Sequence, residues 1–288
     1  MKKILVTGAG GQLGNCIQKL AASRNLDYHF HFVTSAQLDI TDAAAVQELF
    51  AEIKPDFCIN AAAFTAVDLA EKESEKAFAV NATGAENLAK ACAEVKCMLL
   101  HVSTDYVFDG ETEISYSEDN FTNPASVYGQ SKLQGEELAL EHHPETVIIR
   151  TSWLYSEFNK NFVKTMLALF ASREEIGVVG DQYGQPTNAN DLAEALMQII
   201  ESGVKGYGVF HFSNYPETTW YDFAAKIAEY TRADTKINKI TTPEYPTPAS
   251  RPRRSTLSLD KIEEVYGIES RHWENSLEEC LDILAAEK

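Results

Sequence analysis

The sequence is poor in basic residues. Its 288 residues contain 25 lysines and arginines against 43 aspartates and glutamates, which gives a formal net charge of −18 and a pI near 4.8. A protein that binds nucleic acid or anionic lipid over a broad surface needs an excess of positive charge there. We therefore expect neither nucleic acid nor a membrane as a partner. Positive pockets for a phosphorylated ligand have to be local, and the candidates are Lys132, Arg150, Arg251, Arg253 and Arg254.

Cysteines and long apolar runs are also scarce. The five cysteines are odd in number and form neither a C-x-x-C pair nor a zinc-binding spacing. No run of about eighteen apolar residues is present, and the short apolar run near Met1 ends at Val6. These absences argue against a disulfide-stabilised secreted protein, a zinc domain and a membrane-spanning chain. We expect a cytoplasmic protein.

Apolar runs alternate with helical patterns through the first half of the chain. Five apolar runs predict strands, at residues 4–6, 30–34, 57–61, 98–103 and 147–151. Apolar residues at helical spacing predict helices between them, at 43–53 and 74–93. Strands joined by crossover helices predict an α/β fold with a doubly wound, Rossmann-like parallel sheet. Ligands of such a sheet bind beyond the carboxyl ends of the strands.

The second half alternates less regularly. The apolar pattern predicts helices at residues 161–172, 191–201 and 219–230. It also predicts one strand that returns to the sheet, at residues 209–213. The segments between them include loops that are long for simple connectors. We therefore predict a dinucleotide-binding domain at 1–155, to which 188–214 return. A smaller, interleaved C-terminal substrate-binding domain is predicted at 156–187 and 215–288.

Three evenly spaced glycines follow the first predicted strand. Gly8, Gly11 and Gly14 lead into an amphipathic helix. Glycine permits positive φ and close approach of the backbone to a pyrophosphate, and a helix N-terminus offers free N–H groups to that anion. The spacing departs from the usual G-x-G-x-x-G, because Leu13 stands five residues after Gly8. We interpret these glycines, with Gln12 and Leu13, as a dinucleotide-binding loop.

A tyrosine and a lysine lie four residues apart, at Tyr128 and Lys132. On a helix both side chains project from one face, so the ammonium can lie below the phenol. A positive charge there is expected to lower the tyrosine pKa from about 10, which makes Tyr128 a better proton donor. A surface pair on a helix is the competing interpretation. Ser103 and Thr104, at the end of a predicted strand, supply hydroxyls for the same chemistry.

These motifs together resemble the extended short-chain dehydrogenase/reductase family. The resemblance rests on the spaced glycines, residues 60–63, Ser103 with Thr104, and Tyr128 with Lys132. Further segments narrow it to the dTDP-4-dehydrorhamnose reductases within that family. They are residues 61–68, 103–110, 151–153, 181–187 and 245–252, which follow one another in the expected order over nearly the whole chain.

The resemblance implies an NADPH-dependent reduction of the 4-keto group of dTDP-4-dehydro-β-L-rhamnose. The product, dTDP-β-L-rhamnose, would serve the synthesis of surface polysaccharides. In the implied mechanism Tyr128 gives the proton, Thr104 holds the carbonyl oxygen, and Lys132 binds the nicotinamide ribose. The other implied contacts are Asp105, Tyr106, Trp153 and Arg251 for the nucleotide sugar, and Asp39, Ile40, Ala62, Ala63 and Thr65 for the cofactor.

Three of these assignments have structural alternatives. Trp153 presents a large apolar face that suits a deoxy sugar, but a tryptophan also packs in a core. Arg251 can bind a diphosphate through bidentate contacts or belong to an exposed basic patch. Asp39 either contacts the adenine or caps the following helix.

The end of the second predicted strand bears on the choice of cofactor. NAD-preferring sites place an acidic residue there. No carboxylate appears before Asp39 here, and Thr34 and Ser35 can donate hydrogen bonds to a 2′-phosphate. We therefore expect NADPH as the cofactor. Because no arginine lies at this strand end to bind the 2′-phosphate, NADH is also compatible with the sequence.

Metal binding and assembly depend on two further positions. Some members of the resembled family form dimers bridged by magnesium through carboxylates. The matching positions here are Cys16 and Asn190, which lack a carboxylate. We therefore expect no magnesium in the active site and leave a bridging magnesium open, and we expect the chain to be a monomer or a homodimer.

Two other functions stay open. One is another nucleotide-sugar reductase or epimerase, such as one that forms dTDP-6-deoxy-L-talose, because these residues do not determine the stereochemistry at C4. The other is a non-catalytic regulatory subunit, like the relative that binds a methionine adenosyltransferase. Retention of Thr104, Tyr128 and Lys132 argues against a non-catalytic role.

Overall fold

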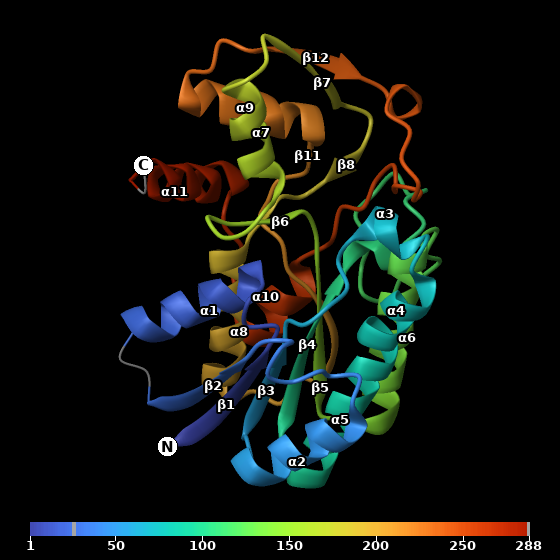
Figure 1. Ribbon diagram of the computed structural model, residues 1–288, viewed down its shortest axis with the longest axis vertical. Coiled ribbons are helices and arrows are strands. Elements are labelled where there is room, and N and C mark those ends of the chain that lie inside the picture. Colours follow the sequence, from blue (N-terminus) through green and yellow to red (C-terminus); the bar gives the residue numbers. More distant parts are fainter. Residues whose placement is uncertain (25–26, 287–288) are drawn as a thin grey trace.

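The computed structural model describes residues 1–24 and 27–286, and a parallel six-stranded sheet forms its lower part (Figure 1). The strands lie in the spatial order β10, β5, β4, β3, β1, β2. Their bounds are β1 Lys2–Thr7, β2 Tyr28–Val33, β3 Phe57–Asn60, β4 Met98–Thr104, β5 Thr146–Thr151 and β10 Gly208–His211. All neighbours pair in parallel, so the predicted doubly wound α/β fold is confirmed.

Helices cover both faces of this sheet. One face carries α1 (Gln12–Ser23), α8 (Ala189–Ser202) and α10 (Asp260–Tyr266), and the other carries α2 (Ala43–Ile53), α5 (Gly84–Val95) and α6 (Val127–His142) (Figure 1). Strands covered on both sides are expected to be apolar without alternation. In β1, Ile4, Leu5 and Val6 are fully buried: Ile4 and Val6 belong to one core cluster, and Leu5 belongs to the other.

The single helix predicted at 74–93 is interrupted. The structure has α4 (Ser74–Phe78), a π-helical turn η1 (Ala79–Thr83), and then α5. Within the turn, Asn81 accepts a hydrogen bond from the Phe64 backbone N–H at 2.8 Å and donates to Ser131 Oγ at 3.0 Å. A π-turn re-aims side chains within a helix, and here it lets Asn81 join the loop after β3 to α6.

The strand order places the ligand-binding edge of the sheet. Strand β1 lies between β2 and β3, so the order of the sheet reverses at β1. A parallel sheet binds ligands beyond the carboxyl ends of its strands at this reversal. The glycine loop follows β1, residues 61–66 follow β3, and Thr104 ends β4. The predicted cofactor and catalytic segments therefore meet at one edge.

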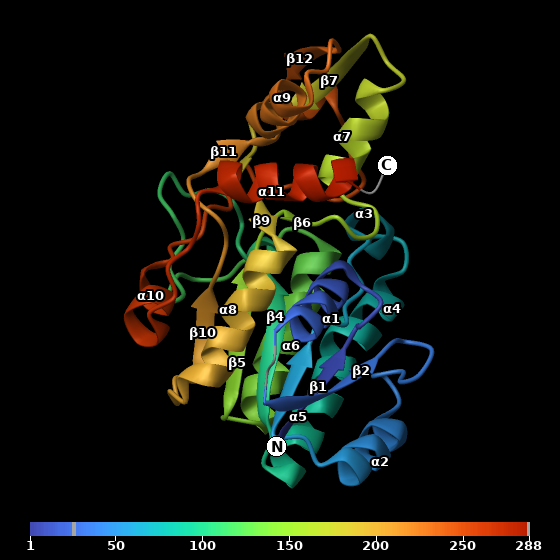
Figure 2. The ribbon, with the colours of Figure 1, turned by 90° about the vertical axis from the view of Figure 1, so that its left-hand side faces the viewer.

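An upper lobe stands over this edge and has its own apolar core. It contains α7 (Phe162–Phe170), α9 (Trp220–Thr231) and α11 (Trp273–Ala286), with a parallel pair of strands, β7 (Glu175–Val179) and β12 (Lys236–Ile240). Figure 2 shows α11 lying across the top of the sheet layer, beneath α7 and α9. The core of the upper lobe includes the fully buried residues Val163, Phe223, Ile227 and Leu277.

Short elements connect the two parts. They are α3 Val67–Ala70, η2 Asp105–Val107, β6 Leu154–Tyr155, β8 Tyr183–Gly184, β9 Thr187–Asn188, β11 Thr218–Thr219 and η3 Thr242–Glu244. Strand β6 pairs with β9, and β8 pairs with β11, which joins segments far apart in the sequence. Within residues 1–24 and 27–286, none of the helices combines the length and apolar character that a bilayer crossing requires.

Candidate active site

A cavity of about 570 Å³ opens at the carboxyl ends of the strands, below the upper lobe. Most of the residues predicted for catalysis, cofactor or substrate line it: Gly11, Gln12, Leu13, Ala63, Thr65, Thr104, Asp105, Tyr106, Tyr128, Lys132 and Trp153. The other predicted residues lie outside its lining: Gly8, Gly14, Thr34, Asp39, Ile40, Ala62 and Arg251. The cavity therefore joins the glycine loop, the end of β4 and the start of α6.

The glycine loop forms one wall and depends on missing side chains. Gly8 has φ +68°, and a Cβ there would lie 2.5 Å from the backbone carbon of Ala61. A Cβ on Gly14 would lie 2.5 Å from the Gly8 carbonyl oxygen. These two glycines thus make the turn and seat it on the end of β3, whereas Gly11 is the N-cap residue just before α1. No side chain caps the first turn of α1, so its N–H groups are available to an anion.

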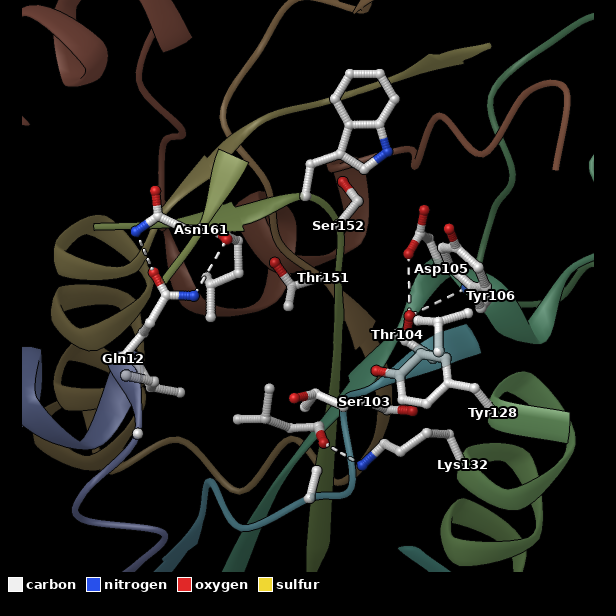
Figure 3. A pocket seen from close by; sticks show the side chains of 18 of the residues that line it. Gln12, Ser103, Thr104, Asp105, Tyr106, Tyr128, Lys132, Thr151, Ser152 and Asn161 are labelled. Atoms are coloured by element: carbon white, nitrogen blue, oxygen red, sulfur yellow. Dashed lines mark hydrogen bonds between the residues drawn. The ribbon is translucent and has the colours of Figure 1, made fainter. Parts of the chain in front are cut away.

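The end of β4 places a hydroxyl and a carboxyl in the cavity. Thr104 Oγ1 donates to Asp105 Oδ1 at 3.0 Å and accepts from the Tyr106 backbone N–H at 3.2 Å (Figure 3). Asp105 is 2% exposed. Its burial raises the carboxyl pKa to about 6, against the lowering effect of hydrogen bonds from Ser255 and Thr104. The Thr104 hydroxyl and the Asp105 carboxyl therefore both line the cavity, and they are hydrogen-bonded to each other.

Helix α6 supplies the tyrosine and the lysine. Ser126 caps the helix by accepting from the Gly129 N–H at 3.1 Å, which places Tyr128 in the first turn. The Tyr128 ring lies edge-on to Tyr106, with centroids 5.6 Å apart. Lys132 is 1% exposed, and its Nζ donates to the Val102 carbonyl at 2.7 Å (Figure 3). The tyrosine, the lysine and Thr104 therefore converge on the cavity from two elements.

The predicted lowering of the Tyr128 pKa by Lys132 is wrong. Burial raises the pKa of Tyr128 to about 12, and the negative charge of Asp105 adds to this effect, while the Thr104 hydroxyl opposes it. Lys132 itself has its pKa lowered by burial to about 8. Its nitrogen is held at Val102 and at His101, 3.2 Å away, so its hydrogen bonds lie on β4.

Two stacked tryptophans form the upper wall. Trp153 has an unusual φ of 45°, and its indole stacks on Trp220 with ring centroids 3.6 Å apart. A Cβ on Gly184 would lie 2.6 Å from the Trp153 ring, so glycine is required for this position of the indole. Trp153 is half-buried and lines the cavity, as a sugar-contacting residue must.

A second cavity, of about 420 Å³, lies beyond Trp220. It shares Tyr106 and Trp220 with the first, and Arg251 lies in its lining. Arg251 Nη2 pairs with Asp68 Oδ2 at 2.9 Å, and the Arg251 side chain is 19% exposed. Arg251 is therefore neither part of the main cavity nor an exposed patch. It bridges the loop before α10 to α3 at the edge of the second cavity.

The expected positive pockets are mostly neutralised. Arg150 is buried and binds Glu136 through two nitrogens, at 3.0 and 2.7 Å. Arg253 pairs with Glu113, and Arg254 pairs with Glu217. The arginines expected to make local positive pockets are thus each paired with an acidic side chain, Arg251 with Asp68 included.

Comparison with known proteins agrees with this geometry. A family model described as the RmlD substrate binding domain matches residues 1–286. The chain belongs to this family. It is 43% identical over 287 residues to the dTDP-4-dehydrorhamnose reductase of Aggregatibacter actinomycetemcomitans, covering 96% of this chain and 97% of that protein.

Solved structures of the same kind are also similar. A dTDP-4-dehydrorhamnose reductase from Clostridium acetobutylicum has a TM-score of 0.94 at 42% identity, covering 98% of this chain and 99% of that one. One from Bacillus anthracis, in complex with NADP, has a TM-score of 0.93 at 38% identity. That match covers 98% of this chain and all of the other.

In this member of the RmlD substrate binding domain family, the segment after β2 has its own local bonds. Thr34 Oγ1 donates to Gln37 at 2.9 Å, and Ile40 is buried in the core. Asp39 accepts from the Thr41 N–H and hydroxyl, at 2.9 and 2.8 Å, which lowers the Asp39 pKa. The alternative that Asp39 caps a helix is wrong, because α2 is capped by Asp42.

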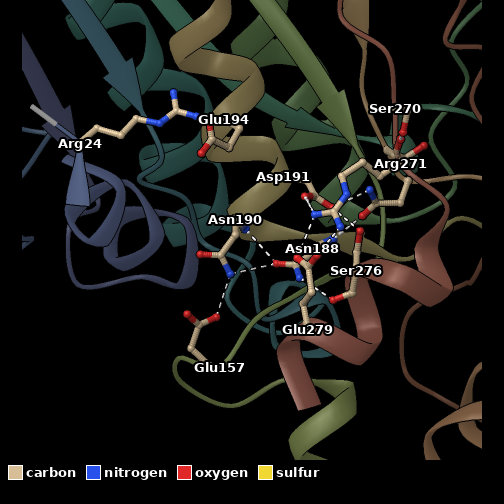
Figure 4. A network of polar contacts seen from close by, with 12 residues as sticks. Arg24, Glu157, Asn188, Asn190, Asp191, Glu194, Ser270, Arg271, Ser276 and Glu279 are labelled. Atoms are coloured by element: carbon tan, nitrogen blue, oxygen red, sulfur yellow. Dashed lines mark hydrogen bonds and ion pairs between the residues drawn. The ribbon is translucent and has the colours of Figure 1, made fainter. Parts of the chain in front are cut away.

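Cys16 and Asn190, the two positions considered for a metal in this family member, have other surroundings in the structure. Cys16 is buried in the core, and burial raises its pKa to about 12. Asn190 donates to Glu157 at 2.9 Å, and Glu157 pairs with Lys19 at 2.6 Å (Figure 4 shows Asn190 and Glu157). Among the described residues, no three histidines, cysteines or acids are grouped so that they could hold a metal ion.

Sequence reasoning missed several residues of this family member's site. Trp220 gives no local signal, because only the folded chain brings α9 to Trp153. Asn161 caps α7 and donates to Gln12 at 2.9 Å, which ties the upper lobe to the glycine loop (Figure 3). His101 did carry a signal, since it is a polar residue inside the apolar run of β4, on the same face as Ser103.

Proposed function

We propose that this chain reduces the 4-keto group of dTDP-4-dehydro-β-L-rhamnose with NADPH. The product is dTDP-β-L-rhamnose, an activated sugar for surface polysaccharides. The observation that carries the proposal is the convergence of Thr104, Tyr128 and Lys132 in one cavity beside the glycine loop. The names of the similar proteins support the same substrate.

The residues present fit a nicotinamide dinucleotide. The uncapped first turn of α1 offers backbone N–H groups to a pyrophosphate, and the backbone at Gly8 and Gly14 leaves no side chain in the way. The adjoining wall of the cavity is lined by Gly11, Gln12, Leu13, Ala63 and Thr65. When bound, the cofactor supplies the hydride for C4 of the sugar.

Tyr128 is the proton donor in this proposal. Its pKa of about 12 keeps the phenol protonated at neutral pH, so the proton is available for the oxygen that becomes negative during hydride transfer. Thr104 lies between Asp105 and the phenol, and its hydroxyl, which donates to Asp105 Oδ1 in the structure, would turn to donate to the same oxygen. Lys132 would hold the nicotinamide ribose, and Trp153 would orient the sugar ring from above.

NADPH is the proposed cofactor, with NADH as a second substrate for the same site. The segment after β2 contains Thr34, whose hydroxyl donates to Gln37 in the structure and would turn to a 2′-phosphate, and no carboxylate lies between Thr34 and Asp39. A 2′-phosphate therefore meets no acidic side chain before Asp39. The similar Bacillus anthracis structure holds NADP, which supports this choice.

The nucleotide end of the substrate is assigned to the upper lobe. Residues 156–187 and 215–288 would form the substrate-binding domain, and 1–155 with 188–214 the cofactor domain. Arg251 and the cavity beyond Trp220 suit a diphosphate and a base, respectively. Tyr106 lines both cavities and Asp105 lines the first, and both would contact the substrate. The enzyme would act as a monomer or homodimer in the cytoplasm.

The test is NADPH oxidation, followed at 340 nm, on addition of dTDP-4-dehydro-L-rhamnose, with the product identified by NMR. We expect rhamnose, and a loss of about 10²- to 10⁴-fold in kcat for Tyr128→Phe, because the phenolic proton is removed while the ring remains. Talose as the product, or equal rates for both proteins, would contradict the proposal.

A further inference from the structure

Four buried polar side chains form a continuous row beneath the candidate active site. They are Thr7 on β1, Asn60 on β3, His101 on β4 and Lys132 on α6, and each is 1% exposed. Lys132 is the one member that the proposed reaction uses. A row of polar groups in an apolar interior is costly unless its donors and acceptors match.

The direction of each hydrogen bond follows from Asn60. Its Oδ1 lies 3.1 Å from the Ala62 backbone N–H, which can only donate, and 2.7 Å from Thr7 Oγ1. The Asn60 oxygen therefore faces these donors, and its Nδ2 faces His101 Nδ1 at 2.8 Å. An amide NH₂ only donates, so Nδ1 of His101 accepts.

The hydrogen of the His101 ring then lies on the other nitrogen. Burial, followed by the charge of Lys132, lowers the His101 pKa well below its ordinary value, so the ring is neutral. A neutral imidazole with an accepting Nδ1 carries its hydrogen on Nε2. That Nε2 lies 3.2 Å from Lys132 Nζ.

If Lys132 is charged, its ammonium N–H and the His101 Nε2–H are two donors that face each other without an acceptor. An ammonium has three donors and no acceptor, whereas a neutral amine has a lone pair that accepts. Lys132 also uses one N–H for the Val102 carbonyl, at 2.7 Å. We propose that His101 is a positioning residue that presents its Nε2–H to Lys132 and stabilises the amine form of Lys132 relative to the ammonium.

The other titratable groups around Lys132 do not cancel this effect. Glu136, one turn along α6, favours the ammonium, but both of its oxygens are bound by Arg150. Tyr128 stays a neutral phenol at neutral pH. Burial acts in the same direction as His101 and lowers the Lys132 pKa to about 8. The row thus supplies a directional contact that favours the amine.

The role of His101 in the reaction cycle rests on the proposed function. When Tyr128 gives its proton to the carbonyl oxygen, a phenolate remains. The hydrogen bonds of Lys132 lie on Val102 and His101, so a proton that passes from its ammonium to the phenolate would cross a bridging hydroxyl or water and would leave an amine. His101 then donates to the lone pair that this transfer creates, so the amine is stabilised at the point in the cycle where it forms.

The first experiment examines the His101 tautomer in the wild-type protein without substrate or cofactor. In protein labelled with ¹⁵N-histidine, we expect the His101 Nδ1 to give the NMR shift of an unprotonated nitrogen and Nε2 that of a protonated one at pH 7. The opposite tautomer, or an imidazolium, would overturn the proposal. Because no variant is needed, the result does not depend on whether a substitution folds.

The second experiment measures the Lys132 pKa with ¹³C-lysine, the resonance being assigned by its absence in Lys132→Arg. In His101→Gln the amide oxygen can accept from the ammonium, so the acid dissociation constant of Lys132 is expected to fall by about tenfold or more. His143→Gln is the matched control, since His143 is also buried but bonds the Cys97 carbonyl. An unchanged Lys132 pKa in folded His101→Gln would overturn the proposal.

Neither measurement uses the ketone substrate. An unexpected tautomer would therefore leave the proposed reduction untouched. Conversely, absence of sugar reduction would remove the proposed function without changing the hydrogen-bond direction in the row.

Discussion

The floor and the upper wall of the candidate active site are built in different ways. On the floor, Lys132, Arg150 and Asp105 are at most 4% exposed, and the sheet and α6 fix their partners. On the wall, Trp153 and Trp220 are half-buried, and they lie just before β6 and at the start of α9. A change on the floor is therefore expected to act on stability, whereas a change on the wall is expected to act mainly on substrate binding.

The largest effect is expected from Arg150→Met. The change leaves the Glu136 carboxylate buried without its bidentate partner, and breaking such a pair costs about 3–5 kcal/mol. The free energy of unfolding, measured with urea at pH 7, should fall by that amount. Arg253→Met is the matched control, because its pair with Glu113 is largely exposed, and its stability should hardly change.

A double variant sharpens this prediction. Arg150→Met combined with Glu136→Gln removes both charges, so it should recover much of the lost stability. If Arg150→Met were no less stable than Arg253→Met, the contrast between a coupled floor and a tolerant surface would be wrong.

A pH-dependent effect of intermediate size is expected from Asp105. Its pKa rises from an ordinary 3.8 to about 6 on folding, so the folded state holds a proton that the unfolded chain has lost between these values. The free energy of unfolding therefore falls as pH rises through this window, by on the order of 3 kcal/mol from this group. Asp105→Asn has no such proton.

The measurement compares urea unfolding of Asp105→Asn and wild type at pH 4, 5, 6 and 7. The stability of the variant relative to wild type should increase steadily with pH and level off above about pH 6. A difference that is independent of pH would show that the Asp105 carboxyl titrates normally in the folded protein.

The same contrast explains what could be predicted from the sequence. The floor rests on local patterns: an apolar run before Gly8, and four-residue spacing between Tyr128 and Lys132. Such patterns follow from the geometry of strands and helices. They correctly predicted the doubly wound sheet and indicated side chains that the structure brings to one cavity.

Features that depend on distant segments could not be predicted in this way. The π-turn at Asn81 follows from its bonds to Phe64 and Ser131, and Trp220 reaches Trp153 only through the fold. The Tyr128 pKa was predicted in the wrong direction for the same reason. Helical spacing places Lys132 near the phenol. Tertiary packing, however, determines both the hydrogen bond from Lys132 to the Val102 carbonyl in β4 and the burial of the Tyr128 ring.

The smallest effect is expected on the wall, from Trp220→Ala. The change removes the ring that stacks on Trp153, and an aromatic pair of this kind contributes about 0.5–1.5 kcal/mol beyond its buried area. Without it, Trp153 is free to leave the position that suits the sugar face. We expect KM for the nucleotide sugar to rise about tenfold with kcat nearly unchanged, as measured by NADPH oxidation.

Trp220→Phe separates loss of the stack from loss of bulk. Phenylalanine keeps an aromatic face toward Trp153, so its KM should lie close to the wild-type value. If Trp220→Ala lowered kcat and left KM unchanged, the tryptophan pair would act in the transition state rather than in binding. The expected role of the wall in substrate binding would then be wrong, because an interaction made only in the transition state changes kcat, whereas uniform binding changes KM alone.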